Sequence, residues 1–166
     1  MPTDFLTLIQ RDHVDLQKEL TQLLEPTATA SELRGSLDGV RLGLMAHAEA
    51  EDIVLGRFDT VAALEALVAQ ARAAHRAQET TLSTLVSARP GTGAWRERAF
   101  HLRMLVRYHA AQEEQGLLPA LRRHVPHAYE ELAGAFATER LRQLAMLQPS
   151  APISFAELAA AEARAS

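Results

Sequence analysis

Histidine lies on the apolar seam of four separate helical segments of this chain, and the spacing of these histidines repeats. The four residues are His13, His47, His75 and His109. The second pair follows the first by 62 residues, and Glu51 and Glu113 keep the same offset. Packing alone does not readily produce a doubled pattern of His followed by His-x3-Glu. The pattern predicts two helical hairpins that are copies of each other, with a two-metal site at the centre of a bundle.

The apolar residues of these segments recur in alternating steps of three and four, which is typical of helices packed at a small tilt. This pattern predicts four long helices, over about residues 3–25, 31–58, 59–87 and 94–123. Their connections are short, which favours antiparallel neighbours in up-down-up-down order. A shorter fifth helix is expected from about Pro126 to Leu147, because proline suits the first turn of a helix. The expected fold is an all-α four-helix bundle with a short added helix.

Length and composition bound the remaining organisation. The 166 residues predict one domain over residues 1–148 and an alanine-rich tail over residues 149–166. Within the tail, Ser154–Arg164 either docks as a helix or frays. Because there is no cysteine, thiolate ligands, disulfides and iron–sulfur clusters are excluded. The net charge of −4 lacks the basic footprint of a nucleic-acid-binding protein.

The targeting signals of the sequence are negative. The N-terminal segment lacks the basic and apolar regions of a signal peptide. No run of about 18 apolar residues predicts a membrane span. We therefore expect a cytoplasmic protein, without a membrane partner, that is a monomer or a homodimer.

The His-x3-Glu motifs have the spacing that metal ligation on a helix needs. Residues four apart share one helical face, so His47 and Glu51 can reach one metal ion together. The same holds for His109 and Glu113. Each carboxylate has two oxygens and can bridge two ions, with imidazoles in terminal positions. Imidazole with carboxylate suits iron among redox metals, with manganese and zinc as alternatives.

A metal-free core is the plain alternative, and free energy argues against it. A buried polar group without a partner costs about 1–3 kcal/mol, and more when it is charged. Six such groups on the seams would consume most of a typical stability of about 5–15 kcal/mol. Either the six residues pair with one another in a metal-free network or they hold cations. Cation binding needs fewer coincidences.

Four segments of the chain resemble the four helices of the hemerythrin-like, or HHE cation-binding, domain. They are RDHVDL, MAHAEAED, AHRAQE and YHAAQEEQGLLPAL, and the resemblance covers about residues 5–121. It implies a left-handed four-helix bundle with a non-haem di-iron centre. The implied terminal ligands are His13 with His47 on one iron and His75 with His109 on the other. Glu51 and Glu113 would bridge the irons together with an oxo or hydroxo group.

One position departs from the oxygen-carrying members of this family. They have a second histidine four residues after the one matching His75, where this chain has Glu79. Glu79 either completes the second iron's ligand set or is a solvated glutamate, because it lies slightly off the seam, which passes through Gln78. As a ligand it would favour ferric iron and lower the potential, which argues against simple reversible oxygen carriage. Glu113, where the oxygen carriers have aspartate, is a milder departure.

Several neighbouring residues are candidates for supporting contacts. Gln17 is the counterpart of Glu79 in the first helix. Tyr108 precedes a predicted ligand and either donates a hydrogen bond to the site or packs in the ordinary way. Asp52 and Glu114 follow the predicted bridging glutamates and are expected on solvated faces.

The sequence supports three hypotheses about function. The first is a di-iron protein that binds or reacts with dioxygen, peroxide or nitric oxide. Reversible binding would not make it an enzyme, whereas peroxide decomposition or oxygen reduction would, and the sequence leaves this open. The second is a metal-sensing or metal-storage module whose bundle stability reports metal occupancy, with the fifth helix as its output. The third is a structural bundle without metal.

Overall fold

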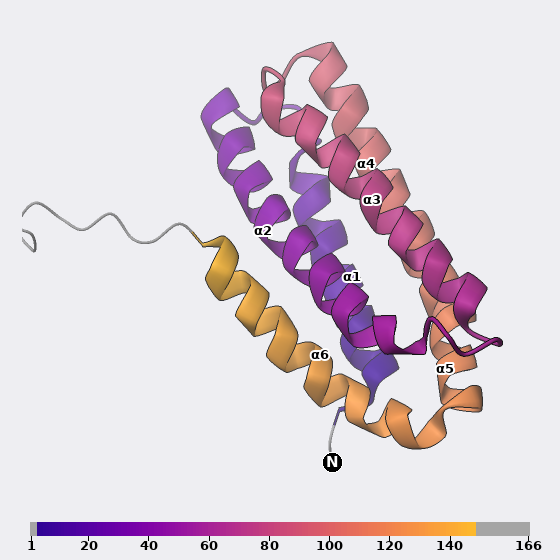
Figure 1. The fold of residues 1–166 in the computed structure, drawn as a ribbon. Coiled ribbons are helices and arrows are strands. Elements are labelled where there is room, and N and C mark those ends of the chain that lie inside the picture. The colour runs from indigo at the N-terminus through magenta and orange to yellow at the C-terminus, as the bar shows by residue number, and fades with distance from the viewer. Residues whose placement is uncertain (1–2, 149–166) are drawn as a thin grey trace, which may run out of the picture.

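The computed structural model describes residues 3–148, and the regular structure in this range is helical throughout. Four long helices form the bundle: α1 (Phe5–Gln22), α2 (Ala30–Leu55), α3 (Glu65–Ser87) and α4 (Gly93–Gln112). Helix α1 packs against α2 and α4, and α3 packs against the same two helices (Figure 1). The predicted all-α bundle is confirmed. The tail over residues 149–166, including Ser154–Arg164, lies outside the described residues.

Local sequence signals fix where the helices begin. The Thr29 hydroxyl accepts a hydrogen bond from the Glu32 amide, and the Glu32 carboxylate accepts one from the Thr29 amide, so α2 starts with a capping box. Helix α4 starts in the same way, with the Thr92 hydroxyl accepting from the Trp95 amide. Gly91 adopts a φ of 81°, which glycine tolerates best, and closes the turn before α4. These short, capped connections make neighbouring helices antiparallel.

The connection between α2 and α3 is longer than predicted. A 3₁₀ turn, η1 (Gly56–Phe58), follows α2, and α3 begins only at Glu65 rather than near residue 59. Phe58 and Leu64 are both buried within this segment. Their burial in the core holds the connection as a compact turn and delays the start of the helix.

The predicted helix over residues 94–123 is divided into three parts. After α4, a π-helical turn, η2 (Glu113–Leu117), leads into α5 (Leu118–His124). A π turn adds a residue to the helical repeat and changes which side chains face inward, and such turns occur often at functional sites. The fifth predicted helix is the structure's α6 (Pro126–Leu147), with the predicted bounds.

The apolar core consists of two clusters at opposite ends of the bundle. One cluster joins Phe5 and Ile9 to residues of η2, α5 and α6. The other surrounds Trp95 and Leu20. The predicted site residues lie between these clusters, so an apolar layer excludes water above and below them.

Helix α6 packs along α2 and also contacts α1. Figure 1 shows it on the side of these two helices, away from α3 and α4. The first helical hairpin is therefore covered by an extra helix. Within residues 3–148, no helix combines the length and the hydropathy that crossing a bilayer requires.

Candidate metal centre

Each bundle helix contributes one buried histidine to a polar layer in the middle of the core. The four, in the order α1 to α4, are His13, His47, His75 and His109. Their exposed fractions are between 1% and 4%. Glu51 and Glu113, each one turn after a histidine, are at most 1% exposed. The structure therefore brings together all six residues that the doubled motif predicts.

The histidines form two pairs, one in each hairpin. Ring centroids lie 5.0 Å apart for His13 and His47, and 4.5 Å apart for His75 and His109. Between the pairs the centroid distances are longer, 6.3 Å from His13 to His109 and 6.4 Å from His47 to His75. The layer thus offers two neighbouring sets of imidazoles.

Both carboxylates lie between the two pairs. One oxygen of Glu113 is 3.4 Å from Nε2 of His13, and the other is 3.4 Å from Nε2 of His109. Oε2 of Glu51 is 3.6 Å from Nε2 of His47 and 3.3 Å from Nε2 of His75. Each glutamate therefore faces both histidine pairs, as a bridging carboxylate must.

The donor atoms of this layer lack the hydrogen-bond partners that buried polar atoms require. Nε2 of all four histidines and both carboxylate oxygens of Glu51 and Glu113 are buried without a hydrogen bond. Two ligand atoms about 2.0–2.2 Å from one metal lie roughly 3.0–3.5 Å from each other, close to the separations here. Donor atoms of His47, Glu51, His109 and Glu113 lie within 4.8 Å of one another and can hold a metal ion. The layer therefore fits bound cations better than a hydrogen-bonded network.

Three carboxylates outside the layer contact the other nitrogen of the imidazoles. Nδ1 of His13 lies 2.8 Å from Glu114 and Nδ1 of His75 lies 2.8 Å from Asp52. Nδ1 of His47 lies 3.0 Å from Asp12. Asp52 and Glu114 were expected on solvated faces, and this expectation is wrong. They are only partly exposed because each reaches a histidine on the adjacent helix.

These contacts determine which imidazole nitrogen faces the layer. An ionised carboxylate only accepts hydrogen bonds, so each of these histidines donates from Nδ1 and leaves the Nε2 lone pair pointing inward. Burial raises the pKa of Asp12, but the hydrogen bond from His47 and the nearby Arg140 outweigh it and hold this pKa below its usual value. The outer carboxylates thus orient the imidazoles for metal binding.

The two hairpins differ around the fourth histidine. The 62-residue offset relates the contact between His13 and Glu114 to the contact between His75 and Asp52. Asp12 has Ala74 as its counterpart, and Nδ1 of His109 has no hydrogen-bond partner. Asp12 also accepts a 2.7 Å hydrogen bond from Nε of Arg140 on α6. The pseudosymmetry therefore fails where α6 contacts one hairpin.

Protein groups alone leave the layer with conflicting charges. Burial and the charge of Glu51 raise the pKa of Glu113 well above its usual value. Burial lowers the pKa of His75, but its contacts with Asp52 and Glu51 outweigh this and raise it to about 10. Burial, with the positive charge of His75, lowers the pKa of His109 to about 3. Protons would have to share the layer with two buried carboxylates, a role that cations fill without them.

Glu79, Gln17 and Tyr108 lie outside the layer. Glu79 is exposed, because the seam of α3 takes a step of three after His75 and buries Gln78 instead. Both amide atoms of Gln78 are buried without a partner. Gln17 is half-buried and donates a 3.4 Å hydrogen bond to the Arg103 carbonyl. Tyr108 is 67% exposed, so neither residue supports the histidines in this structure.

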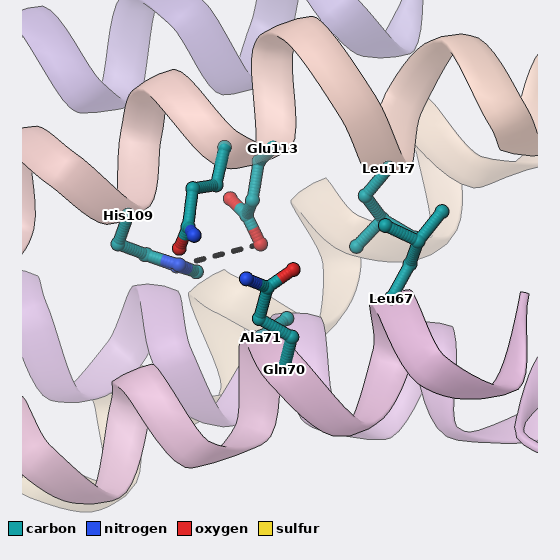
Figure 2. A pocket seen from close by; sticks show the side chains of 7 residues that line it. Leu67, Gln70, Ala71, His109, Glu113 and Leu117 are labelled. Carbon is teal, nitrogen blue, oxygen red and sulfur yellow. Dashed lines mark ion pairs between the residues drawn. The ribbon is translucent and has the colours of Figure 1, made fainter.

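A small opening connects the layer to the surface between α3 and the end of α4. Its lining includes His109 and Glu113 from the layer, with Leu67, Gln70 and Ala71 of α3 on the opposite side (Figure 2). The Gln70 amide lies in front of the contact between His109 and Glu113. The cavity volume is about 10 Å³, roughly what one water molecule needs. The opening admits only a small molecule.

Comparison with known families gives one match. The family model described as Hemerythrin HHE cation binding domain matches residues 4–121. This range contains all six residues of the layer and stops short of α6. Comparisons with curated proteins and with solved structures found no match.

Proposed function

This chain belongs to the family of hemerythrin HHE cation-binding domains, as its motifs predict, and from that premise we propose that it holds two non-haem iron ions. The iron pair would bind or react with dioxygen, peroxide or nitric oxide. The observation that carries this proposal is the buried layer in which each glutamate faces both histidine pairs. Manganese and zinc are the alternative metals.

The proposed ligand assignment follows the contacts within the layer. His13 and His47 bind one iron, and His75 and His109 bind the other. Glu51 and Glu113 bridge the two, because their oxygens face imidazoles of both pairs. Glu79 is no longer part of the proposed set, because its side chain is exposed.

Residues around the ligands control what the centre meets. A bound iron pair supplies electrons and an open coordination position to a small oxidant or gas. The apolar clusters on both sides of the layer exclude bulk water. The Phe136 ring, 5.7 Å from the His47 ring, covers the first histidine pair from α6. Asp12, Asp52 and Glu114 hold three imidazoles in a fixed orientation.

Metal analysis combined with an optical spectrum tests the proposal. Protein purified in air is expected to contain iron at two ions per chain and to absorb in the near ultraviolet as oxo-bridged ferric pairs do. Adding dioxygen, peroxide or nitric oxide to the reduced protein should then change the spectrum. The His109→Ala variant should lose this response, while His101→Ala, an exposed histidine on the same helix, should keep it. Wild-type protein without metal under iron-replete expression would reject the proposal in favour of a structural bundle.

A metal-sensing role is the second candidate, and one contact favours it. Asp12 accepts hydrogen bonds from His47 of the layer and from Arg140 of α6. A change in metal occupancy that alters His47 is therefore passed to α6 through a single carboxylate. Because α6 lies outside the matched family range, it is a natural element for contacting a partner.

Hydrogen exchange of α6 amides tests the sensing role. If metal occupancy controls α6, chelation should speed exchange in residues 126–147, and Arg140→Ala should speed it even with metal bound. The effect on metal affinity should be smaller, about 10–100-fold, as for other residues that support a ligand. Arg142→Ala is the control, because Arg142 contacts Glu139 of its own helix. Equal exchange of α6 with and without metal would exclude this role.

A further inference from the structure

The two histidine pairs differ in their access to the surface, although the hairpins that carry them are copies. The opening between α3 and the end of α4 reaches His109 and Glu113. The corresponding region of the first hairpin is filled. The 62-residue offset shows why, because it pairs each residue of the opening with a counterpart beside the first pair.

Residue size creates the opening. Ala71, one turn before His75, corresponds to Ile9, one turn before His13. Ile9 is fully buried and fills its position, whereas the methyl group of Ala71 leaves space in front of His109. Leu67, at the outer edge of the opening, corresponds to Phe5. Small side chains on α3 therefore replace large ones on α1.

Helix α6 seals only the first hairpin. The Phe5 ring packs against Phe136 of α6 at 6.0 Å, and Phe136 in turn packs on His47. Figure 1 shows no part of α6 over the outer face of α3 and α4. The second pair is thus the one that a molecule from solvent can approach.

The lining of the opening has the chemistry to hold a small polar ligand. Gln70 and Gln112 place side-chain amides beside His109 and Glu113. Amides can donate hydrogen bonds to an oxygen or nitrogen atom that carries partial negative charge. Leu67 and Leu117 supply the apolar wall. The small volume restricts the ligand to a few atoms.

We propose that the exogenous ligand enters between α3 and η2 and binds on the side of His75 and His109, with Ala71 providing the room. Gln70 and Gln112 hydrogen-bond its outer atoms. This inference rests on the proposed function and adds to it by naming the reactive side of the centre. The first pair, under α6, is the closed side and serves to hold its ion.

Azide binding to the oxidised, metal-loaded protein tests the inference. Azide is suitable because its outer atoms would have to occupy the opening. The Ala71→Ile variant restores the side chain found at Ile9 and should weaken azide binding at least about tenfold, which is 1.4 kcal/mol, with unchanged iron content. Ala73→Ile, an exposed position on the same helix, is the matched control and should bind azide as the wild type does.

A second variant keeps the test decisive if Ile at position 71 disturbs the ligands. Leu67→Trp enlarges the outer wall away from the layer and should slow azide association in stopped-flow measurements. Full iron content with wild-type azide affinity and association rate in both variants would overturn the inference and leave the proposed function intact. A wild-type protein that binds no iron would overturn the proposed function itself. Iron content, measured on every variant, separates these two failures.

Discussion

The Glu51→Ala variant is expected to lose both metal ions. Its carboxylate contacts His47 of the first pair and His75 of the second, so it cannot be removed from one site alone. Because Glu51 is completely buried, no water-filled space allows a neighbouring carboxylate to replace it. The loss of affinity should exceed the 10–100-fold that is typical of residues supporting a ligand.

The contrast with a terminal histidine makes this prediction specific. His75→Ala should retain the ion held by His13 and His47, because that pair keeps both imidazoles and both carboxylates. Metal content after desalting, measured by mass spectrometry, distinguishes the two outcomes, and circular dichroism shows whether each variant is folded. Glu49→Ala is the control, an exposed glutamate two residues before Glu51. Retention of one ion by Glu51→Ala would contradict the bridging role.

The residues of the layer could be predicted because helical periodicity is a local property. A histidine on an apolar seam faces the core wherever the helix packs, and the second copy of each motif independently supports the first. The bounds of α6 follow for a similar reason, since Pro126 defines its first turn. The fold and the six inward-facing residues thus follow from patterns within single segments.

Contacts between helices could not be predicted in this way. Asp52 and Glu114 lie about 100° around the helix from the bridging residues that precede them, which reads as a solvated face. Only the packing of the next helix places a histidine beside each of them. One signal was present in the sequence, because Asp52 and Glu114 keep the 62-residue offset. Asp12 has no counterpart, and its role depends on Arg140, 128 residues away.

Glu79 shows how a difference of one residue changes a prediction. A spacing of four after His75 suggested a ligand by analogy with the two His-x3-Glu motifs. The seam of α3 instead takes a step of three, so Gln78 is buried and Glu79 is exposed. Similarly, the π turn at Glu113–Leu117 has no signal in the spacing of the apolar residues. Both outcomes depend on how neighbouring helices pack.

Removing the metal is expected to lower the melting temperature by on the order of 8–16 °C. A ligand present at a thousandfold excess over its Kd stabilises the folded state by about 4 kcal/mol, and each kcal/mol shifts the melting temperature of a chain of this size by about 2–4 °C. Differential scanning fluorimetry with and without a chelator measures this change. An identical melting temperature in both conditions would contradict metal binding in the folded state.

The Glu113→Leu variant should reverse this dependence on metal. Without a cation, Glu113 is a buried carboxyl group whose pKa is raised by burial and by Glu51, so replacing it with a hydrocarbon side chain removes a destabilising group. Replacement of a buried ionic group by a packed apolar one often stabilises a protein by about 1–4 kcal/mol. Chelated Glu113→Leu should therefore melt above chelated wild type, and added iron should no longer raise its melting temperature. Glu97→Leu, an exposed glutamate on α4, should leave the metal-dependent shift unchanged. A variant less stable than chelated wild type would show that Glu113 stabilises the bundle through protein contacts alone.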